Sequence, residues 1–98
     1  SVLSQNKEIN VLIEGHTDNV PYTGTTILDN WDLSVKRATA IVRILEEKGV
    51  SQTQITAAGR SEYMPVGTNE TTEGKAKNRR IEIILAPNLD EISKLLKE

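Results

Sequence analysis

The chain has 98 residues, of which 37% are hydrophobic and 27% are charged, and its formal net charge is −2. Such a length and composition are typical of one soluble globular domain. The mildly acidic balance argues against a general nucleic-acid or anionic-membrane binder. The absence of cysteine excludes disulfides, thiol nucleophiles and thiolate metal sites. The only aromatic residues are Tyr22, Trp31 and Tyr63, which leaves few candidate surfaces for stacking on bases or sugars.

Three segments have the composition of β-strands, with β-branched or alternating apolar residues that end at a glycine or a proline. They cover residues 9–14, 55–59 and 80–85. Alternation in the last segment places Ile81, Ile83 and Leu85 on one face. Because the strands alternate with helical patterns, we expect an α/β (α+β) two-layer sandwich, in which helices cover one face of a small mixed β-sheet.

A long polar loop over residues 15–30 separates the first strand from the main helix, and long loops of this kind are often functional. The main helix is expected to begin at an N-cap formed by Asp32 or Ser34 and to end near Lys48, with Gly49 as its stop signal. A short helix and a terminal amphipathic helix are predicted over 72–78 and 88–98. We therefore divide the chain into a domain over 1–86 and an appended helix over 87–98.

Arg37 lies at the border of the apolar face of the main helix, on the same flank as Ser34 and Asn30. An arginine at this position can lay its aliphatic stem on the core and extend its guanidinium across the N-terminal end of the helix. Asp18 stands just after the first strand, where ligand sites of layered α/β domains cluster. A purely local role, accepting backbone N–H groups in a turn, stays open for Asp18.

His16 and Asp18 could together supply two metal ligands or an oriented base. No second histidine, cysteine or acidic residue at ligand spacing supports such a site, so neither a metal nor a cofactor is expected. We expect His16 to hydrogen-bond the following loop and to hold Asp18 in place.

The run Lys75–Arg80 contains four cations in six residues, and a nucleic-acid patch is one interpretation of it. Because Arg79 and Arg80 lead into a strand, one of them is expected to point to a site and the other to solvent. A carboxylate and a border arginine suit a zwitterionic ligand, since each charge of the ligand can meet its opposite. No nucleophile elbow, phosphate-binding glycine loop or paired-carboxylate motif is present, so we expect no enzyme activity and no catalytic residues.

Ordered motifs between residues 9 and 86 resemble the OmpA-like C-terminal domain: EGHTD at 14–18, NWDLS at 30–34 and NRR at 78–80. HTDNVP followed by a long loop before NWDLS is most similar to the branch that contains the flagellar stator protein MotB. The resemblance implies a non-catalytic module that binds peptidoglycan in the periplasm of diderm bacteria. Such a module tethers an envelope protein to the cell wall, with attachment to the outer or inner membrane made only by segments outside this chain.

The resemblance also implies which residues contact the ligand, the diaminopimelate of a peptidoglycan stem peptide. Asp18 would contact the free ammonium group, and Arg37 would clamp the carboxylate on the same stereocentre. Arg80 would support the strand. The remaining implied positions either support the ligand by hydrogen bonds or border it: Thr17, Asn30, Asn78 and Arg79.

The chain departs from the family pattern at both ends. The family topology is β-α-β-α-β-β, whereas only residues 1–7 precede the first strand predicted here. Either the chain is a fragment or the sheet lacks the first strand. The alternative function is a protein–protein interaction or oligomerisation domain of an envelope or flagellar stator protein, and a homo-oligomer stays open.

Overall fold

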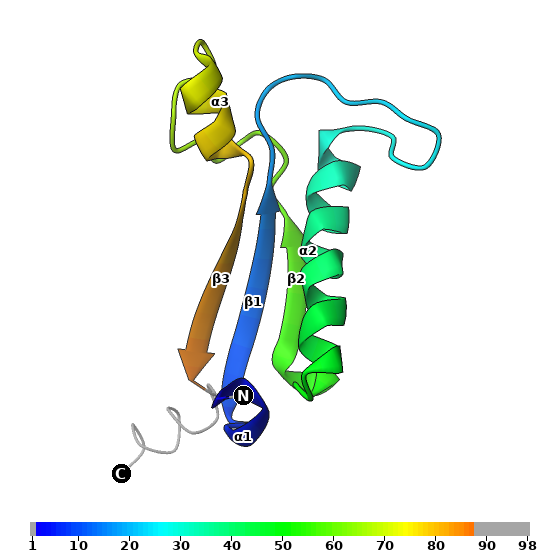
Figure 1. The fold of residues 1–98 in the computed structure, drawn as a ribbon, viewed down its shortest axis with the longest axis vertical. Helices are drawn as coiled ribbons and strands as arrows, with labels where there is room; N and C mark the ends of the chain where they lie inside the picture. The colour runs from blue at the N-terminus through cyan, green and yellow to red at the C-terminus, as the bar shows by residue number, and fades with distance from the viewer. Residues whose placement is uncertain (1, 88–98) are drawn as a thin grey trace, which may run out of the picture.

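The computed structural model describes residues 2–87, which form one three-stranded sheet with helices (Figure 1). The strand order is β2-β1-β3, with β1 parallel to β2 and antiparallel to β3. The predicted terminal helix over 88–98 lies outside the described residues. The elements in chain order are α1 (Val2–Gln5), β1 (Ile9–His16), α2 (Asn30–Glu47), a 3₁₀ turn (Gln52–Gln54), β2 (Ile55–Gly59), α3 (Thr72–Asn78) and β3 (Arg80–Pro87).

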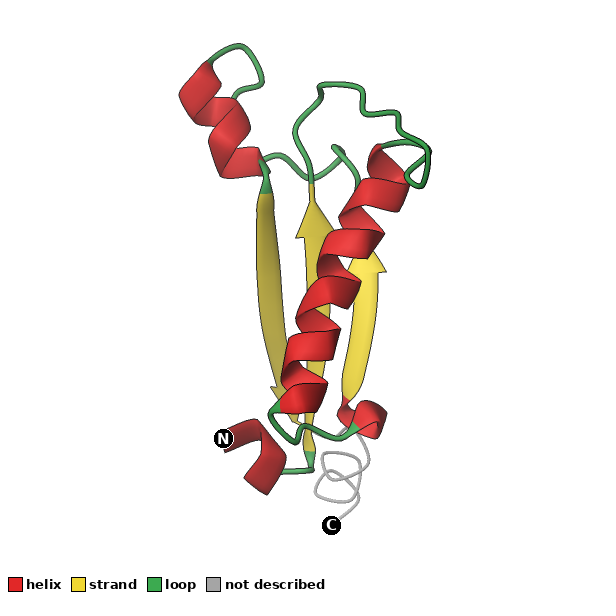
Figure 2. Cartoon of the chain, turned by 45° about the vertical axis from the view of Figure 1, so that its right-hand side comes forward, coloured by secondary structure: helices red, strands yellow, loops and turns green. Residues whose placement is uncertain are grey.

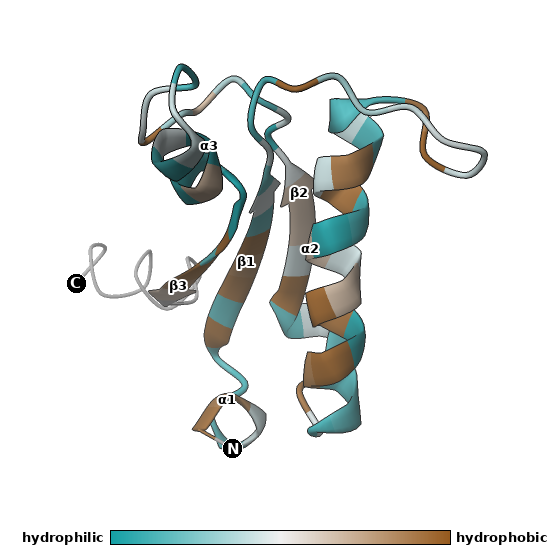
Figure 3. Ribbon diagram, turned by 45° about the horizontal axis from the view of Figure 1, so that its top comes forward, coloured by the Kyte–Doolittle hydropathy of each residue, from teal (hydrophilic) through white to brown (hydrophobic). Residues whose placement is uncertain are grey.

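Helix α2 forms the second layer and packs across β1 and β2 (Figure 2). The fully buried core consists of Val11 and Ile13 from β1 and Ala38 from α2, with Ile41 and Leu45 packed around it. Hydrophobic residues of β1 and α2 lie along this contact between the layers (Figure 3). The predicted fold class is confirmed, and α2 supplies its helical layer, whereas α3 lies beyond the end of the sheet (Figure 1). None of the helices in the described range is both long and apolar enough to cross a bilayer.

Strand β3 keeps much of its apolar surface exposed. Ile81 packs against the core, but Ile83 and Leu85 on the same face are 52% and 56% exposed. The cause is the position of α2, which covers β1 and β2 and leaves β3 without a helix over it within residues 2–87. The predicted alternation of β3 is therefore present, but only its first member is packed in the core.

The N-cap of α2 is Asp29, not Asp32 or Ser34 as predicted. Asp29 has an extended backbone, and its carboxylate accepts the N–H of Asp32 at 3.0 Å. Ser34 instead lies fully buried inside the helix, where its hydroxyl donates to the carbonyl of Trp31. The C-terminal prediction is confirmed, because Gly49 follows α2 with a φ of 88°, a conformation that favours glycine.

Close backbone packing brings the N-terminal part of α2 against the ends of β1 and β2. A Cβ added to Gly15 would lie 1.9 Å from the carbonyl oxygen of Ser34, and one added to Gly59 would lie 2.4 Å from the Ser34 hydroxyl. The same hydroxyl accepts the backbone N–H of Ser61 at 3.1 Å. Two glycines and one serine thus hold the helix start beside the strand ends, where the candidate site lies.

Candidate functional site

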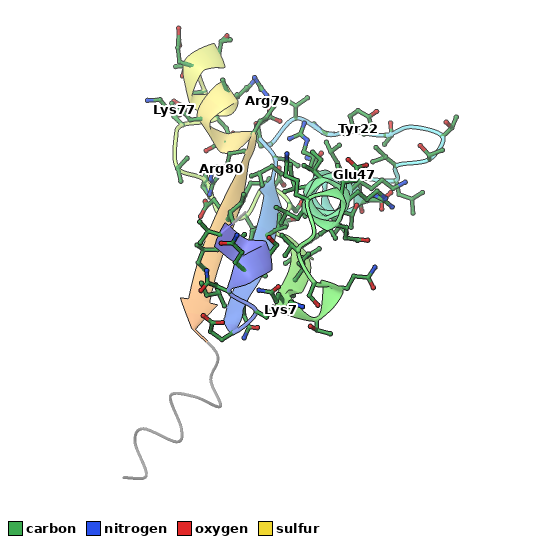
Figure 4. The ribbon with its side chains drawn as sticks, turned by 60° about the horizontal axis from the view of Figure 1, so that its bottom comes forward. Lys7, Tyr22, Glu47, Lys77, Arg79 and Arg80 are labelled. Atoms are coloured by element: carbon green, nitrogen blue, oxygen red, sulfur yellow. The ribbon has the colours of Figure 1, made fainter. Side chains whose placement is uncertain are left out.

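A surface cavity of about 310 Å³ opens at the end of the sheet where β1 and β2 finish and β3 begins. This volume is at the lower end of those found for small-molecule sites. The loop after β1, the first two turns of α2 and Arg79, which lies between α3 and β3, all contribute to it, and Figure 4 shows Tyr22 and Arg79 at this end of the molecule. Five of the six predicted binding residues line the cavity: Thr17, Asp18, Asn30, Arg37 and Arg79.

Asp18 is buried at the cavity wall and holds two hydrogen bonds. Its Oδ1 accepts the backbone N–H of Val20 at 3.0 Å, and its Oδ2 accepts Nη1 of Arg79 at 2.6 Å. Burial acts to raise the pKa of Asp18, but the Arg79 hydrogen bond, the Val20 N–H and the charges of Arg79 and Lys75 outweigh it and lower the pKa below its ordinary value. The carboxylate is therefore ionised at neutral pH. Asp18 thus accepts a backbone N–H in the local turn and also lines the cavity.

Arg37 reaches the cavity from the border of α2, the position expected from helical spacing. Its Nη1 donates to the carbonyl oxygen of His16 at 3.1 Å, the only hydrogen bond of its guanidinium within residues 2–87. A guanidinium carries five N–H donors, so several remain for a ligand. The bond to β1 orients the group without using up its capacity to bind a carboxylate.

Thr17 and Asn30 hold the loop that forms the cavity wall. The backbone N–H of Thr17 donates to the carbonyl of Ser61, and its hydroxyl donates to the carbonyl of Asp18. The side-chain amide of Asn30 donates to the carbonyl of Val20 at 3.0 Å. The Oδ1 atom of Asn30 is buried and has no hydrogen-bond partner within the described part of the chain.

Asn78 does not line the cavity, contrary to the expectation that it borders the ligand. It is fully buried, and its Oδ1 accepts the backbone N–H groups of Val66 and Gly67, each at 2.8 Å. The amide therefore shapes the turn before α3 and has no donor or acceptor directed at the site. Arg80 supports its strand as expected, since its Nε donates to Glu82 at 2.6 Å.

His16 does not hold Asp18 through its ring, so that prediction is wrong. Because Val11 and Ile13 face α2, His16 projects from the opposite face of β1, beside Glu14. Its Nε2 lies 3.5 Å from Glu14 and 3.6 Å from Glu82, and neither ring nitrogen has a hydrogen-bond partner among residues 2–87.

The three side chains of this cluster, Glu14, His16 and Glu82, bring ligand atoms within 4.8 Å of one another, a spacing that could hold a metal ion. Arg60 and Arg80 already pair with the two carboxylates, and the Arg80 hydrogen bond lowers the pKa of Glu82 below its ordinary value. Two guanidinium charges thus balance two carboxylates, which disfavours a further divalent cation. Sequence reasoning missed the cluster because only the β1–β3 pairing places Glu82 opposite Glu14.

Comparison of the chain with known proteins identifies its family. The model of the OmpA family matches residues 1–79. The chain belongs to the OmpA family. It is 40% identical to Motility protein B of Bacillus subtilis over 88 residues, which cover 89% of this chain and 34% of that protein. It is 39% identical to the peptidoglycan-binding protein ArfA of Mycobacterium tuberculosis over 75 residues, 76% of this chain and 22% of that protein.

A solved structure, the periplasmic domain of MotB from Helicobacter pylori, has a TM-score of 0.80 and 25% sequence identity, and it covers 93% of this chain and 58% of that one. The predicted likeness to the MotB branch of the OmpA family is confirmed. The chain spans about a third of the length of Motility protein B and less of ArfA.

Proposed function

We propose that this OmpA-family domain binds peptidoglycan in the periplasm and tethers an envelope protein to the cell wall without catalysis. The similarity to a protein named as peptidoglycan-binding and to a periplasmic domain supports the class of ligand and the compartment. The observation that carries the proposal is the meeting of Asp18 and Arg37 on one cavity wall. An acid and a guanidinium from different elements then present opposite charges to one small ligand.

The ligand that we assign to this cavity is the diaminopimelate of the stem peptide. One stereocentre of that amino acid carries both an ammonium and a carboxylate group. Asp18 accepts hydrogen bonds from the ammonium, and Arg37 donates two parallel N–H groups to the carboxylate, a geometry that lysine cannot reproduce. The N-terminal end of α2 adds positive potential on the carboxylate side.

Arg79 donates to one oxygen of Asp18, at 2.6 Å. Its side chain is 42% exposed, so the ion pair is partly screened by water and contributes only modestly to stability. The arriving ammonium group shares the carboxylate with Arg79 or displaces it toward solvent. Arg79 thus keeps the Asp18 carboxylate ionised and positioned until a ligand binds.

A single site of this kind gives weak binding to a free stem peptide, in roughly the micromolar to millimolar range. Peptidoglycan presents many identical stems. An oligomeric parent protein would gain strength through avidity without any further contact.

The decisive test compares two synthetic stem peptides by isothermal titration calorimetry, one with diaminopimelate and one with lysine at the same position. Lysine keeps the side-chain ammonium but lacks the neighbouring carboxylate. We expect wild-type protein to prefer the diaminopimelate peptide by roughly 10- to 100-fold, the value of one charge-assisted pair. Arg37→Ala should abolish this preference, whereas Arg43→Ala, at an exposed position of α2, should keep it. Equal affinity of wild-type protein for both peptides would refute the assignment.

A second test uses intact sacculi of the diaminopimelate type. Asp18→Asn should lose co-sedimentation while its circular dichroism spectrum stays that of the wild type. Glu47→Gln, which neutralises an exposed acid at the far end of α2, is the matched control and should sediment normally. Normal sedimentation of a folded Asp18→Asn variant would remove Asp18 from the site.

A second candidate function, interaction with a protein partner or with a second copy of the chain, is favoured by one observation. Ile83 and Leu85, which share one face of β3, are 52% and 56% exposed, and exposed apolar patches mark interaction surfaces. Light scattering of the full chain and of a chain lacking 88–98 tests this role. A monomer in both cases, with wall binding retained, would argue against it.

A further inference from the structure

The binding cavity carries more positive charge than the assigned ligand group can balance. Among the described residues that line it, Asp18 is the only acid, whereas Arg37 and Arg79 are both cationic. Lys75 adds a third positive charge, which acts on the Asp18 carboxylate and helps to lower its pKa. The stereocentre that bears one ammonium and one carboxylate group is neutral overall. The site therefore keeps an excess of positive charge, which a further anionic group of the ligand would balance.

Arg79 and Lys75 lie on the same side of α3. They are four residues apart, and the backbone N–H of Arg79 donates to the carbonyl oxygen of Lys75 at 3.2 Å, so their side chains are neighbours along the helix. Lys75 is partly buried, and none of the ion pairs among residues 2–87 includes it. Lys77 is exposed and lies on the other side of the helix, because a step of two residues is a rotation of about 200°. Figure 4 shows Lys77 and Arg79 on opposite sides of α3.

Arg79 is held less firmly than its neighbour Arg80. The guanidinium of Arg80 donates three hydrogen bonds, to one carboxylate and two backbone carbonyls, and its side chain is 19% exposed. The guanidinium of Arg79 has a single partner within residues 2–87, Oδ2 of Asp18, and its side chain is 42% exposed. An ion pair with this exposure contributes little to stability, so Arg79 can change its partner at little cost in free energy.

A ligand that brings both an ammonium group and a further carboxylate can use this freedom. We propose that Arg79 and Lys75 form an anion subsite, which binds a second carboxylate of the stem peptide when the ligand's ammonium group takes the place of Arg79 on Asp18. The Asp18–Arg79 ion pair is thereby exchanged for two ion pairs with the ligand, and the excess positive charge is reduced. The proposal rests on the function proposed above, because the ammonium group that releases Arg79 is that of diaminopimelate.

A stem tetrapeptide carries two carboxylates that could occupy the anion subsite. One is the α-carboxylate of the glutamate that precedes diaminopimelate, and the other is the carboxylate at the C-terminus. Each is attached within one residue of diaminopimelate, about 3.5 Å of extended chain, so each lies near the cavity when diaminopimelate is bound.

The surroundings of the cavity favour the side of α3 for such a carboxylate. The neighbouring cavity is lined by all three aromatic residues of the chain and by Asp29 and Glu62, but by no lysine or arginine. A carboxylate there would meet like charges with no cation to offset them. The second carboxylate is therefore expected at Arg79 and Lys75.

The test uses isothermal titration calorimetry with a diaminopimelate tetrapeptide and with two derivatives, each amidated at one of these two carboxylates. For wild-type protein we expect amidation of one carboxylate to weaken binding roughly tenfold, the value of one charge-assisted pair, and amidation of the other to change little, which identifies the group. Arg79→Gln should reduce this loss to about twofold or less, and Lys75→Gln should reduce it in part. Arg79→Gln should also bind the amidated peptide at least as tightly as wild type does, because Asp18 then has no competing guanidinium. Lys77→Gln removes the same charge from the other side of α3 and is the matched control, which should keep the full loss.

The outcomes separate the anion subsite from the proposed function. Equal affinity of wild-type protein for all three peptides, or an undiminished loss in Arg79→Gln, would overturn the subsite; a retained preference for diaminopimelate over lysine would then leave the proposed function standing. A loss on amidation that Arg79→Gln removes, in a protein with no preference for diaminopimelate over lysine, would support the subsite and refute the role of Arg37. Binding of none of the peptides would refute both.

Discussion

Gly15→Ala is the sharpest test of how the fold positions the site. The new Cβ would lie 1.9 Å from the carbonyl oxygen of Ser34 and 2.8 Å from its carbonyl carbon, whereas relaxed contacts between such atoms are about 3.5–4.0 Å. The obstacle is backbone of α2, so the helix itself must move by more than an ångström. That movement would disturb packing around Ala38 and the buried hydrogen bond from Ser61 to Ser34.

Overpacking of this kind costs about 1–3 kcal/mol, and a buried N–H left without its acceptor costs about the same again. We therefore expect Gly15→Ala to lower the free energy of unfolding by about 2–4 kcal/mol in urea titrations and to lower the Tm by at least about 10 °C. Gly24→Ala is the matched control, because its Cβ would meet only ordinary contacts, the nearest at 3.4 Å from the ring of Tyr22. Equal stability of the two variants would refute the claim that the strand and helix are in backbone contact.

Three further predictions concern single interactions. Because the folded-state pKa of Asp18 is lowered, its carboxylate stabilises the fold above its unfolded value of about 3.9, and that contribution is lost as the pH falls toward the folded pKa. We therefore compare the free energy of unfolding of wild type and Asp18→Asn in urea from pH 7 to pH 2. The difference between the two proteins should be constant near neutral pH and should shrink below about pH 4. A difference that stays constant over the whole range would contradict the lowered pKa of Asp18. Asn78→Ala should destabilise the domain by at least about 2 kcal/mol, since the backbone N–H groups of Val66 and Gly67 lose their acceptor, and calorimetry should show a lower Tm. Gly49→Ala should cost about 1–2 kcal/mol in the same assay, because the residue has a φ of 88°.

Asn78 and Arg79 are neighbours in one motif, but one has a structural role and the other lies at the cavity. Arg79 lines the cavity and pairs with Asp18, whereas Asn78 is fully buried and uses its amide to hold the turn before α3. A change at Asn78 would still weaken ligand binding, but through the position of the strand start. Binding and thermal stability should therefore fall together for Asn78 variants, whereas Arg37 variants should lose binding with little loss of thermal stability.

The amino-acid sequence by itself determined the strands and main helices and placed Asp18 after a strand and Arg37 at a helix border. Strand β2 and helix α3 have the predicted bounds, and β1 and β3 each extend two residues further than predicted. Helical spacing alone predicts Arg37 at the border of the apolar face, because the border of an apolar stripe is a local property of one helix; the structure shows that this border faces the cavity. Asp18 followed from its position after a strand. Hydrophobic periodicity and the position of a residue after a strand depend only on near neighbours in the chain, so both can be predicted from the sequence without the tertiary structure.

Tertiary structure decided the features that depend on which segments meet. Asp29, Asp32 and Ser34 are all good N-cap residues; the close contact between Gly15 and Ser34 places Ser34 inside α2, and Asp29 becomes the cap. The antiparallel register of β1 and β3 directs His16 toward carboxylates and away from the loop. The gathering of three distant aromatic rings around one cavity depends on three separate loops and helix ends. Composition alone suggested few stacking surfaces, since the chain has only three aromatic residues. Composition could not predict that these three rings lie together, because the number of aromatic residues in a sequence says nothing about their distance in the fold.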